Sequence, residues 1–288
     1  MSIGITALFV CLDDFCNLYE SAQKSQSLPS SKQRNRQGYL SLSELLLIEV
    51  YFHFSAYKDF KRYYLYGICL EHRSKFGKLP SYQRFVAHKK QLFLPLTILL
   101  QSLKGQETGL YFADSTHIKV CHNKRISRHK VFDGLATRGK STMGWFFGLK
   151  LHLILNHQGE IMAIKITPGN TDDRKALKNM IKSLKGKCYA DKGYLGKKIF
   201  QTLWEKGLHL ITGIRKNMKQ HFMPYIDKIL LRKRFIIEST FNVLKTSMTL
   251  EHSRHRSIIN GFVNMLSTLA AYAFKKCKPK IKTNLLKP

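Results

Sequence analysis

The spacing of hydrophobic positions changes character near residue 105. Before it, apolar residues recur every three or four positions, which predicts helices. Ser41 and Glu44 have the spacing of a capping box ahead of a long apolar run. The polar stretch 21–38 is typical of a linker or loop. The pattern therefore predicts a helical domain over residues 1–105.

After residue 105, short strands alternate with helices. Strands are expected at 111–118, 145–155, 160–167, 187–191 and 208–214, and helices at 172–184, 197–206, 227–248 and 258–274. The order β-β-β-α-β-α-β-α is that of the α/β class called ribonuclease H-like, a mixed five-stranded sheet with flanking helices. We expect this fold over residues 106–275, followed by a basic tail over 276–288.

Charge gives the first indication of a partner. The chain has 49 Lys and Arg against 18 Asp and Glu, a formal net charge of +31. Such a surplus destabilises a compact chain unless a polyanion neutralises it, and a nucleic-acid backbone is the usual polyanion. A ribosomal protein, a nuclease and a membrane-surface protein would share this charge. Residues 106–288 hold 35 basic and 11 acidic residues, so each acid there needs an explanation.

The cysteines and the apolar segments indicate a cellular compartment. Six cysteines form no CxxC pair, which favours reduced thiols in a cytoplasmic, nucleoid-associated protein. His117, Cys121 and His122 lack a second cluster, which argues against a zinc site. The apolar start has no basic leader, and no apolar stretch is long enough to span a bilayer. We expect a soluble protein with no membrane partner.

Two aspartates lie in or at the end of predicted strands. Asp114 follows Tyr111-Phe112-Ala113, and Asp191 follows Cys188-Tyr189-Ala190. An acid in an apolar strand is costly unless it is paired or bound to a metal. The expected topology makes the first and fourth strands neighbours, so both aspartates come close together. Either one alone could equally be a strand-end cap or a turn-anchoring hydrogen-bond acceptor.

A third acid lies between two bases in a predicted helix. At about 100° per residue, Arg234 and Lys245 share one face with Glu238, beside an apolar stripe that would pack on the sheet. A surface ion pair between Arg234 and Glu238 is the simpler interpretation. It leaves Lys245 and both strand aspartates unexplained.

Together these motifs resemble the DDE transposases of bacterial insertion sequences and look most similar to insertion-sequence family 982. The resemblance rests on the strand around Asp114, the Ala190–Tyr194 motif, and the spacing of Arg234, Glu238 and Lys245. It spans roughly residues 41–274 and includes segments 121–125, 144–153, 167–173 and 251–257. Related transposases often have a tyrosine three residues before the arginine. This chain has Leu231 there, so no role of that tyrosine is carried over.

The resemblance implies a metal-dependent reaction on DNA. Asp114, Asp191 and Glu238 are then catalytic and hold two Mg²⁺ ions, or Mn²⁺ in their place, and Arg234 and Lys245 contact the transposon end. Mg²⁺ takes hard oxygen ligands. Two such ions about 3.5–4 Å apart activate an attacking oxygen and stabilise the leaving oxygen of a phosphodiester. Water attack would free 3′-OH ends, which would then attack target DNA.

More basic residues crowd the connection between the first two strands. A charge run is commonly a solvated face, but beside the proposed site contact with the DNA backbone is favoured for Lys124, Arg125, Arg138 and Lys140. His152, in mid-strand, is either close to the metal or a hydrogen-bonded core histidine.

The expected function is that of a transposase. Its helical domain binds the terminal inverted repeats, and a homodimer brings two ends and the target DNA together. Two alternatives stay open. A nuclease or resolvase of the same fold would cleave without joining, and a non-catalytic relic of a transposase would only bind DNA.

Overall fold

The computed structural model describes residues 3–26, 38–141, 144–181, 184–214, 218, 222–251 and 255–281. These residues pack as two units. The helical unit takes the chain up to Leu103 together with 247–250 and 255–276. The sheet unit takes its residues from 104–246, 251–254 and 277–288. No helix among the described residues is both long and apolar enough to cross a membrane.

Five longer helices build the first unit. They are α1 (Ile5–Gln26), α2 (Leu42–Tyr51), α4 (Tyr82–His88), α5 (Phe93–Ser102) and α10 (Ile258–Phe274). Shorter helical turns lie between α2 and α5: η1 (Phe52–Phe54), α3 (Phe60–Arg62), η2 (Tyr63–Glu71), η3 (Arg73–Lys75) and η4 (Lys89–Leu92).

The predicted capping box at the start of α2 is confirmed. The backbone N–H of Ser41 donates to Glu44 Oε2 at 2.7 Å, and the Ser41 hydroxyl accepts from the Glu44 N–H at 3.2 Å. The predicted linker begins later than expected, because α1 continues through residues 21–26. Residues 27–37 of that linker lie outside the described residues.

Aromatic and apolar side chains form the core of the helical unit. Phe52, Tyr63, Tyr64 and Phe85 are buried, so these rings pack in the core and do not form a surface on which bases could stack. Lys89, from the expected basic helix face, is buried as well and pairs with buried Glu49 at 2.8 Å.

The last helix belongs to this unit, although the sequence assigned it to the region 106–275. Helix α10 packs against α5 and α2. Buried His53 contributes to the position of α10 in this unit. Its Nε2 lies 2.8 Å from Ser267 Oγ of α10, and its Nδ1 lies 2.7 Å from the Met248 carbonyl oxygen. Both faces of α10 are apolar, so it needs partners on several sides.

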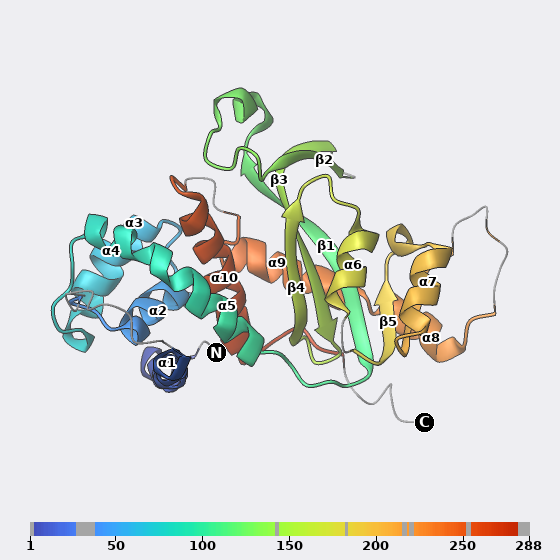
Figure 1. Ribbon diagram of the computed structural model, residues 1–288, viewed down its shortest axis with the longest axis horizontal. Coiled ribbons are helices and arrows are strands. Elements are labelled where there is room, and N and C mark those ends of the chain that lie inside the picture. Colours follow the sequence, from blue (N-terminus) through green and yellow to red (C-terminus); the bar gives the residue numbers. More distant parts are fainter. Residues whose placement is uncertain are drawn as a thin grey trace. The chain divides into compact units, whose positions relative to one another are not determined.

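The second unit is a sheet with helices on both faces (Figure 1). Its strands are β1 (Leu110–Cys121), β2 (Thr137–Ser141), β3 (Gly144–Asn156), β4 (Ile161–Pro168), β5 (Gly186–Ala190) and β6 (Leu208–Thr212). Its helices are α6 (Asp173–Met180), α7 (Lys197–Trp204), α8 (Tyr225–Arg232) and α9 (Phe235–Asn242), with short turns η5 (Asn123–Arg128), η6 (Lys192–Tyr194) and η7 (Val243–Ser247).

The strand order is that of the ribonuclease H-like fold. Strand β3 pairs antiparallel with β1 and β4, whereas β1–β5 and β5–β6 are parallel, which gives the order β4-β3-β1-β5-β6. The predicted fold class is therefore confirmed. The sheet has a sixth strand, because β2 pairs with the first residues of β3. The sequence of β2, Thr-Arg-Gly-Lys-Ser, lacks the apolar alternation that reveals a strand.

Alternation along β1 decides where its aspartate points. Tyr111 and Ala113 pack in the apolar cluster with α6 and α7, whereas Phe112 packs in the cluster with α8 and α9. Because successive strand residues face opposite sides, Asp114 faces α8 and α9. Figure 1 shows α6 in front of the sheet and α9 behind it.

The long helix expected over 227–248 is interrupted. Helix α8 ends at Arg232, α9 begins at Phe235, and the chain then forms the π turn η7. At the junction, the Arg234 N–H donates to the Leu231 carbonyl oxygen three residues back, at 3.4 Å. The break and the π turn both change the angular positions that a regular helix gives to Arg234, Glu238 and Lys245.

The buried ion pair of the helical unit gives a first prediction. Glu49→Ala is expected to lower the free energy of unfolding by about 3–5 kcal/mol, because it leaves the Lys89 ammonium buried without its partner. The double variant Glu49→Leu, Lys89→Met is expected to be close to the wild type. Urea unfolding of both proteins measures this, and a single variant as stable as the double one would contradict it.

Candidate active site

Strand pairing brings the two predicted aspartates together. In the parallel pair β1–β5, Ala113 lies opposite Ala190. Each of these alanines is followed by an aspartate, Asp114 in β1 and Asp191 just after β5. The expected adjacency of these strands is therefore confirmed, although 77 positions separate the two aspartates in the sequence.

Helix α9 brings the third acid to the same place through Arg234. The Arg234 guanidinium lies 3.0 Å from Asp114 Oδ2, 3.6 Å from Asp191 Oδ1 and 3.3 Å from Glu238 Oε1. The side chains of Arg234 and Asp114 are each 20 % exposed, while those of Asp191 and Glu238 are 56 % and 58 % exposed. The cluster is thus closed beneath Asp114 and open to solvent at the other two acids.

Asp114 has a clear shift of its pKa. The pKa of Asp114 is raised from 3.8 to about 6, mainly by burial and to a lesser extent by the nearby Asp191 and Glu238 carboxylates. The Ser115 N–H, which donates to Asp114 Oδ1 at 2.8 Å, and Arg234 act in the opposite direction. These two effects therefore do not outweigh the burial of the Asp114 carboxyl.

The donor set suits a divalent cation in chemical type. Carboxylate oxygens are the ligands that Mg²⁺ and Mn²⁺ prefer, and three of them here already surround one positive group. In the part of the chain that the structure describes, no three His, Cys, Asp or Glu side chains are spaced to hold a metal ion. The acids are arranged around a guanidinium, and a metal would require them to rearrange.

The second basic residue of the helix motif lies apart from this cluster. Lys245 Nζ donates to the His117 carbonyl oxygen at 2.6 Å and pairs with Glu251 Oε1 at 3.1 Å. Glu251 also accepts from the Lys119 N–H at 3.3 Å. The π turn therefore directs Lys245 to β1 and not to Glu238, and helix periodicity could not reveal its acidic partner Glu251.

The four basic residues expected to bind DNA backbone are exposed and lie farther along the sheet. Lys124 and Arg125 are in η5, and Arg138 and Lys140 are in β2. Arg138 lies opposite Phe147, whereas Asp114 lies opposite Leu153, six residues farther along β3. Six strand residues span roughly 20 Å, so these bases do not touch the carboxylates.

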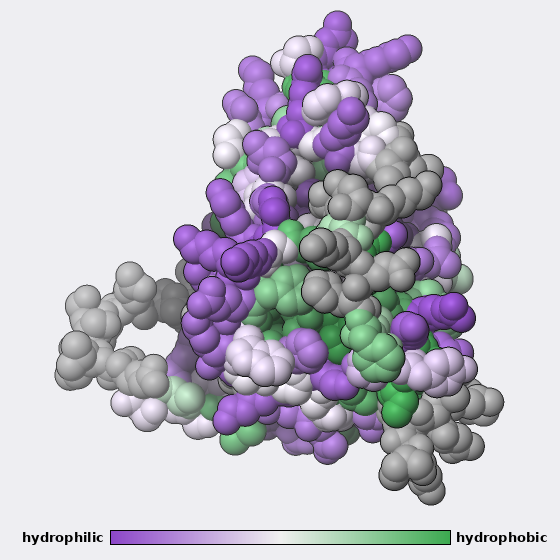
Figure 2. All heavy atoms as spheres, turned by 90° about the vertical axis from the view of Figure 1, so that its right-hand side faces the viewer, coloured by the Kyte–Doolittle hydropathy of each residue, from purple (hydrophilic) through white to green (hydrophobic). Residues whose placement is uncertain are grey.

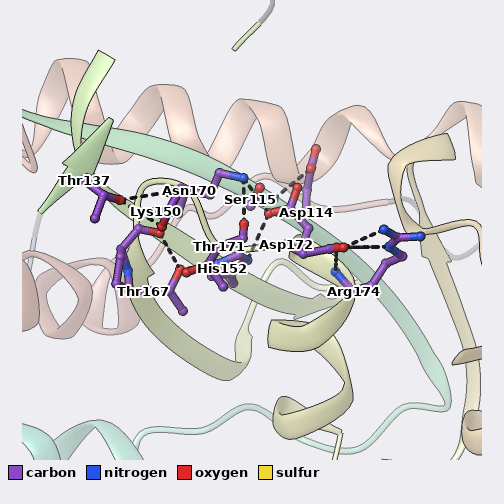
Figure 3. Close-up of polar contacts among 12 residues, drawn as sticks. Asp114, Ser115, Thr137, Lys150, His152, Thr167, Asn170, Thr171, Asp172 and Arg174 are labelled. Atoms are coloured by element: carbon purple, nitrogen blue, oxygen red, sulfur yellow. Dashed lines mark hydrogen bonds and ion pairs between the residues drawn. The ribbon is translucent and has the colours of Figure 1, made fainter. Parts of the chain in front are cut away.

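A polar network on the other face of the sheet was only partly predicted (Figure 3). Lys150 Nζ pairs with Asp173 Oδ1 at 3.1 Å and donates to the Thr171 carbonyl oxygen at 3.0 Å. His152 Nε2 lies 2.8 Å from Thr167 Oγ1, and burial lowers the pKa of His152 to about 4. His152 is thus a hydrogen-bonded core histidine.

The start of α6 differs from the expectation by one residue. The helix begins at Asp173 with Asp172 as its N-cap, and the Asp172 carboxylate accepts from the Arg174 N–H at 2.9 Å. The neighbouring acids Asp172 and Asp173 therefore have separate tasks, one at the helix terminus and the other on Lys150. The adjacent pair of acids is visible in the sequence, but the contact of Asp173 with Lys150 depends on the fold.

A separate pocket of about 860 Å³ lies beside β6. Its lining is mostly apolar and includes Phe200, Ile211 and Met223. Figure 2 shows apolar residues gathered in a hollow with hydrophilic residues around it. The one acid in its lining, Asp227, is held by Lys187 Nζ at 2.9 Å and by the Tyr189 hydroxyl at 2.7 Å. This pocket contains no group of acids like the one around Arg234.

The raised pKa of Asp114 predicts a pH-dependent change in stability. Between about pH 4 and pH 6 the folded chain keeps a proton that the unfolded chain has lost, so the free energy of unfolding falls as the pH rises through that window. Asp114→Asn is therefore expected to raise Tm by a few degrees at pH 7 in EDTA and to leave it unchanged at pH 4. Thermal melts across this range measure the difference, with Asp191→Asn as the more exposed control. A loss of Tm at pH 7 would contradict the prediction.

Comparison with known proteins identifies a family. The family model described as "Transposase DDE domain" matches residues 104–258, which are 155 of the 288 residues. No curated protein matches the chain.

Solved structures of the Mos1 transposase resemble this chain with low sequence identity and low TM-scores. The Mos1 strand transfer complex is 12 % identical with a TM-score of 0.27, covering 92 % of this chain and 87 % of that one. The Mos1 mariner paired end complex with Mn is 13 % identical with a TM-score of 0.26, covering 92 % and 86 %. Because the family match covers more than half of the chain and includes all three acids, this chain belongs to the DDE transposase domain family.

Proposed function

We propose that this chain is an active transposase. It cleaves the ends of an insertion sequence and joins their 3′-OH groups to target DNA. Among insertion sequences we infer the family 982 type, from the motifs around Asp114, Asp191 and Glu238. A bacterial cytoplasm is the compartment that fits this element and its reduced cysteines.

The observation that carries the proposal is an imbalance of charge. Among the described residues of the sheet unit, four other acids each have a basic partner of their own: Asp172, Asp173, Asp227 and Glu251. Asp114, Asp191 and Glu238 share the single base Arg234, so the cluster has a formal charge of −2. In a chain of net charge +31, such a cluster is costly unless it binds cations.

We assign Asp114, Asp191 and Glu238 to hold two Mg²⁺ or Mn²⁺ ions. Cations bound by these oxygens would activate the attacking oxygen and stabilise the leaving one. Asp114 is the most enclosed of the three and is fixed by the Ser115 N–H. Asp191 and Glu238 are exposed and can face a DNA phosphate.

Arg234 and Lys245 can contact the transposon end only after exchanging partners. Arg234 is held by three acids and Lys245 by Glu251. Cations entering the cluster would compete with the Arg234 guanidinium for the same oxygens and free it to bind a phosphate. A guanidinium suits this exchange, because it can bind carboxylate and phosphate with the same two-pronged geometry.

Other basic residues supply affinity for the DNA backbone. Lys124, Arg125, Arg138 and Lys140 are exposed, and among the residues that the structure describes no acid forms an ion pair with them. We assign the helical region 1–105 to recognition of the terminal inverted repeats. Bringing two ends together calls for two active sites, so we propose a homodimer in the synaptic complex.

A joining assay tests the activity. DNA with the inverted repeats that flank the gene is incubated with Mg²⁺ and a target plasmid, and both nicked and joined products are measured. Asp114→Asn and Glu238→Gln are each expected to reduce both products by at least about a hundredfold, because each removes a charged ligand from the site. Glu205→Gln, an exposed acid at the end of α7, is the matched control and should retain activity.

Each alternative function gives its own pattern of products. Nicking without joining would indicate a nuclease or resolvase, and DNA binding without either product would indicate a relic. Wild-type rates in Asp114→Asn or Glu238→Gln would remove these residues from the site.

The shared base gives a prediction about cations that needs no DNA. Arg234→Ala is expected to lower the free energy of unfolding in EDTA by about 1–3 kcal/mol, because three carboxylates lose their hydrogen-bonded cation. Mn²⁺ should restore part of this loss. Thermal melts with and without Mn²⁺ measure it, with the exposed Arg232→Ala as control. An equal loss in both variants, or no effect of Mn²⁺, would contradict the cation site.

A further inference from the structure

An exposed tryptophan lies within the basic surface of the sheet unit. Trp145 in β3 is 62 % exposed. It lies opposite Lys140 of β2, whose Nζ is 5.8 Å from the centroid of its ring. Arg138 lies two residues from Lys140 and therefore on the same face of the β2–β3 pair. A large aromatic ring is thus left uncovered beside two cations.

The neighbouring aromatic side chain on this face, Phe147, is covered by the protein, in contrast to Trp145. Phe147, two residues after Trp145, is only 9 % exposed. His129 packs edge-on against it, with ring centroids 6.1 Å apart. The η5 segment also reaches Trp145, since Asn123 Nδ2 donates to its carbonyl oxygen at 2.8 Å. This contact fixes the backbone of Trp145 and leaves its ring free.

The charge around Trp145 identifies the partner. From Ser115 to Lys150 the chain contains eight Lys and Arg and one acid, Asp133. A protein partner with an apolar surface would need matching acids, whereas DNA brings phosphates and flat bases together. Aromatic rings among basic residues are the usual platform for unpaired bases, because every base can stack on them.

We propose that Trp145 is a stacking platform for an unpaired DNA base, with Lys140 and Arg138 binding the adjacent phosphates. The inference rests on the proposed function only in taking DNA as the ligand. Trp145 lies eight residues along β3 from Leu153, the partner of Asp114. Eight strand residues span roughly 26 Å, which is about eight nucleotides. The platform therefore holds DNA at a distance from the reacting phosphate and takes no part in the chemistry.

Fluorescence of the full-length chain tests this directly. The chain has two tryptophans, so Trp204→Phe leaves Trp145 as the only one. In EDTA, a 15-nucleotide single strand should quench its emission, whereas heparin, a polyanion without bases, should bind with little quenching. A duplex of the same sequence should quench it less than the single strand. Trp145→Phe, in which Trp204 emits, is the matched control and should show little change with any ligand.

Affinity provides the second measurement. Trp145→Ala should weaken single-strand binding about tenfold, whereas duplex binding should change less than about twofold, because a stacked base is lost only in the first case. Trp145→Phe keeps an aromatic ring and should retain most of the affinity.

Three results would overturn the platform: single-strand binding without quenching, equal quenching by heparin or duplex, or unchanged affinity in Trp145→Ala. These experiments contain no metal and involve no bond cleavage, so their failure is distinct from failure of the joining assay. Joining with an unquenched Trp145 would remove the platform alone. Quenching without joining would remove the transposase activity and leave the platform.

Discussion

Three carboxylates cannot be gathered at one place in a sheet without a positive group between them. In this protein that group is the Arg234 guanidinium, which lies 3.0–3.6 Å from Asp114, Asp191 and Glu238. It joins β1, β5 and α9, so the same contacts that balance charge also dock the helix on the sheet. The balance is incomplete, since burial and the neighbouring acids still raise the pKa of Asp114 to about 6. Asp114 therefore holds a proton more readily than an exposed aspartate does, even with its arginine in place.

The proximity of these acids could be predicted from the sequence, because each lies in a strand or helix with a clear spacing of apolar residues. Asp114 and Asp191 each follow an apolar run, and the order of strands makes those runs neighbours with Ala113 opposite Ala190. Arg234 keeps the contact with Glu238 that helix periodicity gives, but the direction of Lys245 was not predictable in this way. It depends on a break at Arg234 and a π turn after Asn242, which shift the helix by fractions of a turn. Periodicity assumes a regular helix and cannot reveal such shifts.

Two further differences have tertiary causes. Strand β2 is polar and exists because β3 is long enough to pair with β4 over one part and with β2 over the other. Helix α10 follows the sheet in sequence but packs with α2 and α5, where His53 binds Ser267. The partners of α10 lie far away in the chain and cannot be read from local sequence. The partner of β2 is the next strand, but the polar sequence of β2 lacks the apolar alternation that would reveal the pairing. The exposed ring of Trp145 was missed for the same reason: only the fold shows that Phe147 is covered and Trp145 is not.

The acidic cluster and the exposed bases Arg138 and Lys140 lie opposite different parts of β3. This distance affects what each group can contribute to the reaction rate. Contacts by Arg138, Lys140 and Trp145 lie far from the carboxylates and would be the same before and during bond cleavage, so they can raise affinity without raising the rate. Only groups that meet the charge developing at the phosphate lower the barrier. Under the proposed function these would be the three acids, the cations that they bind and the guanidinium that those cations displace. A basic surface that extended into the cluster would neutralise the acids and remove their affinity for metal. Under the proposed function, the distance between the exposed bases and Asp114 therefore keeps the acids available to cations.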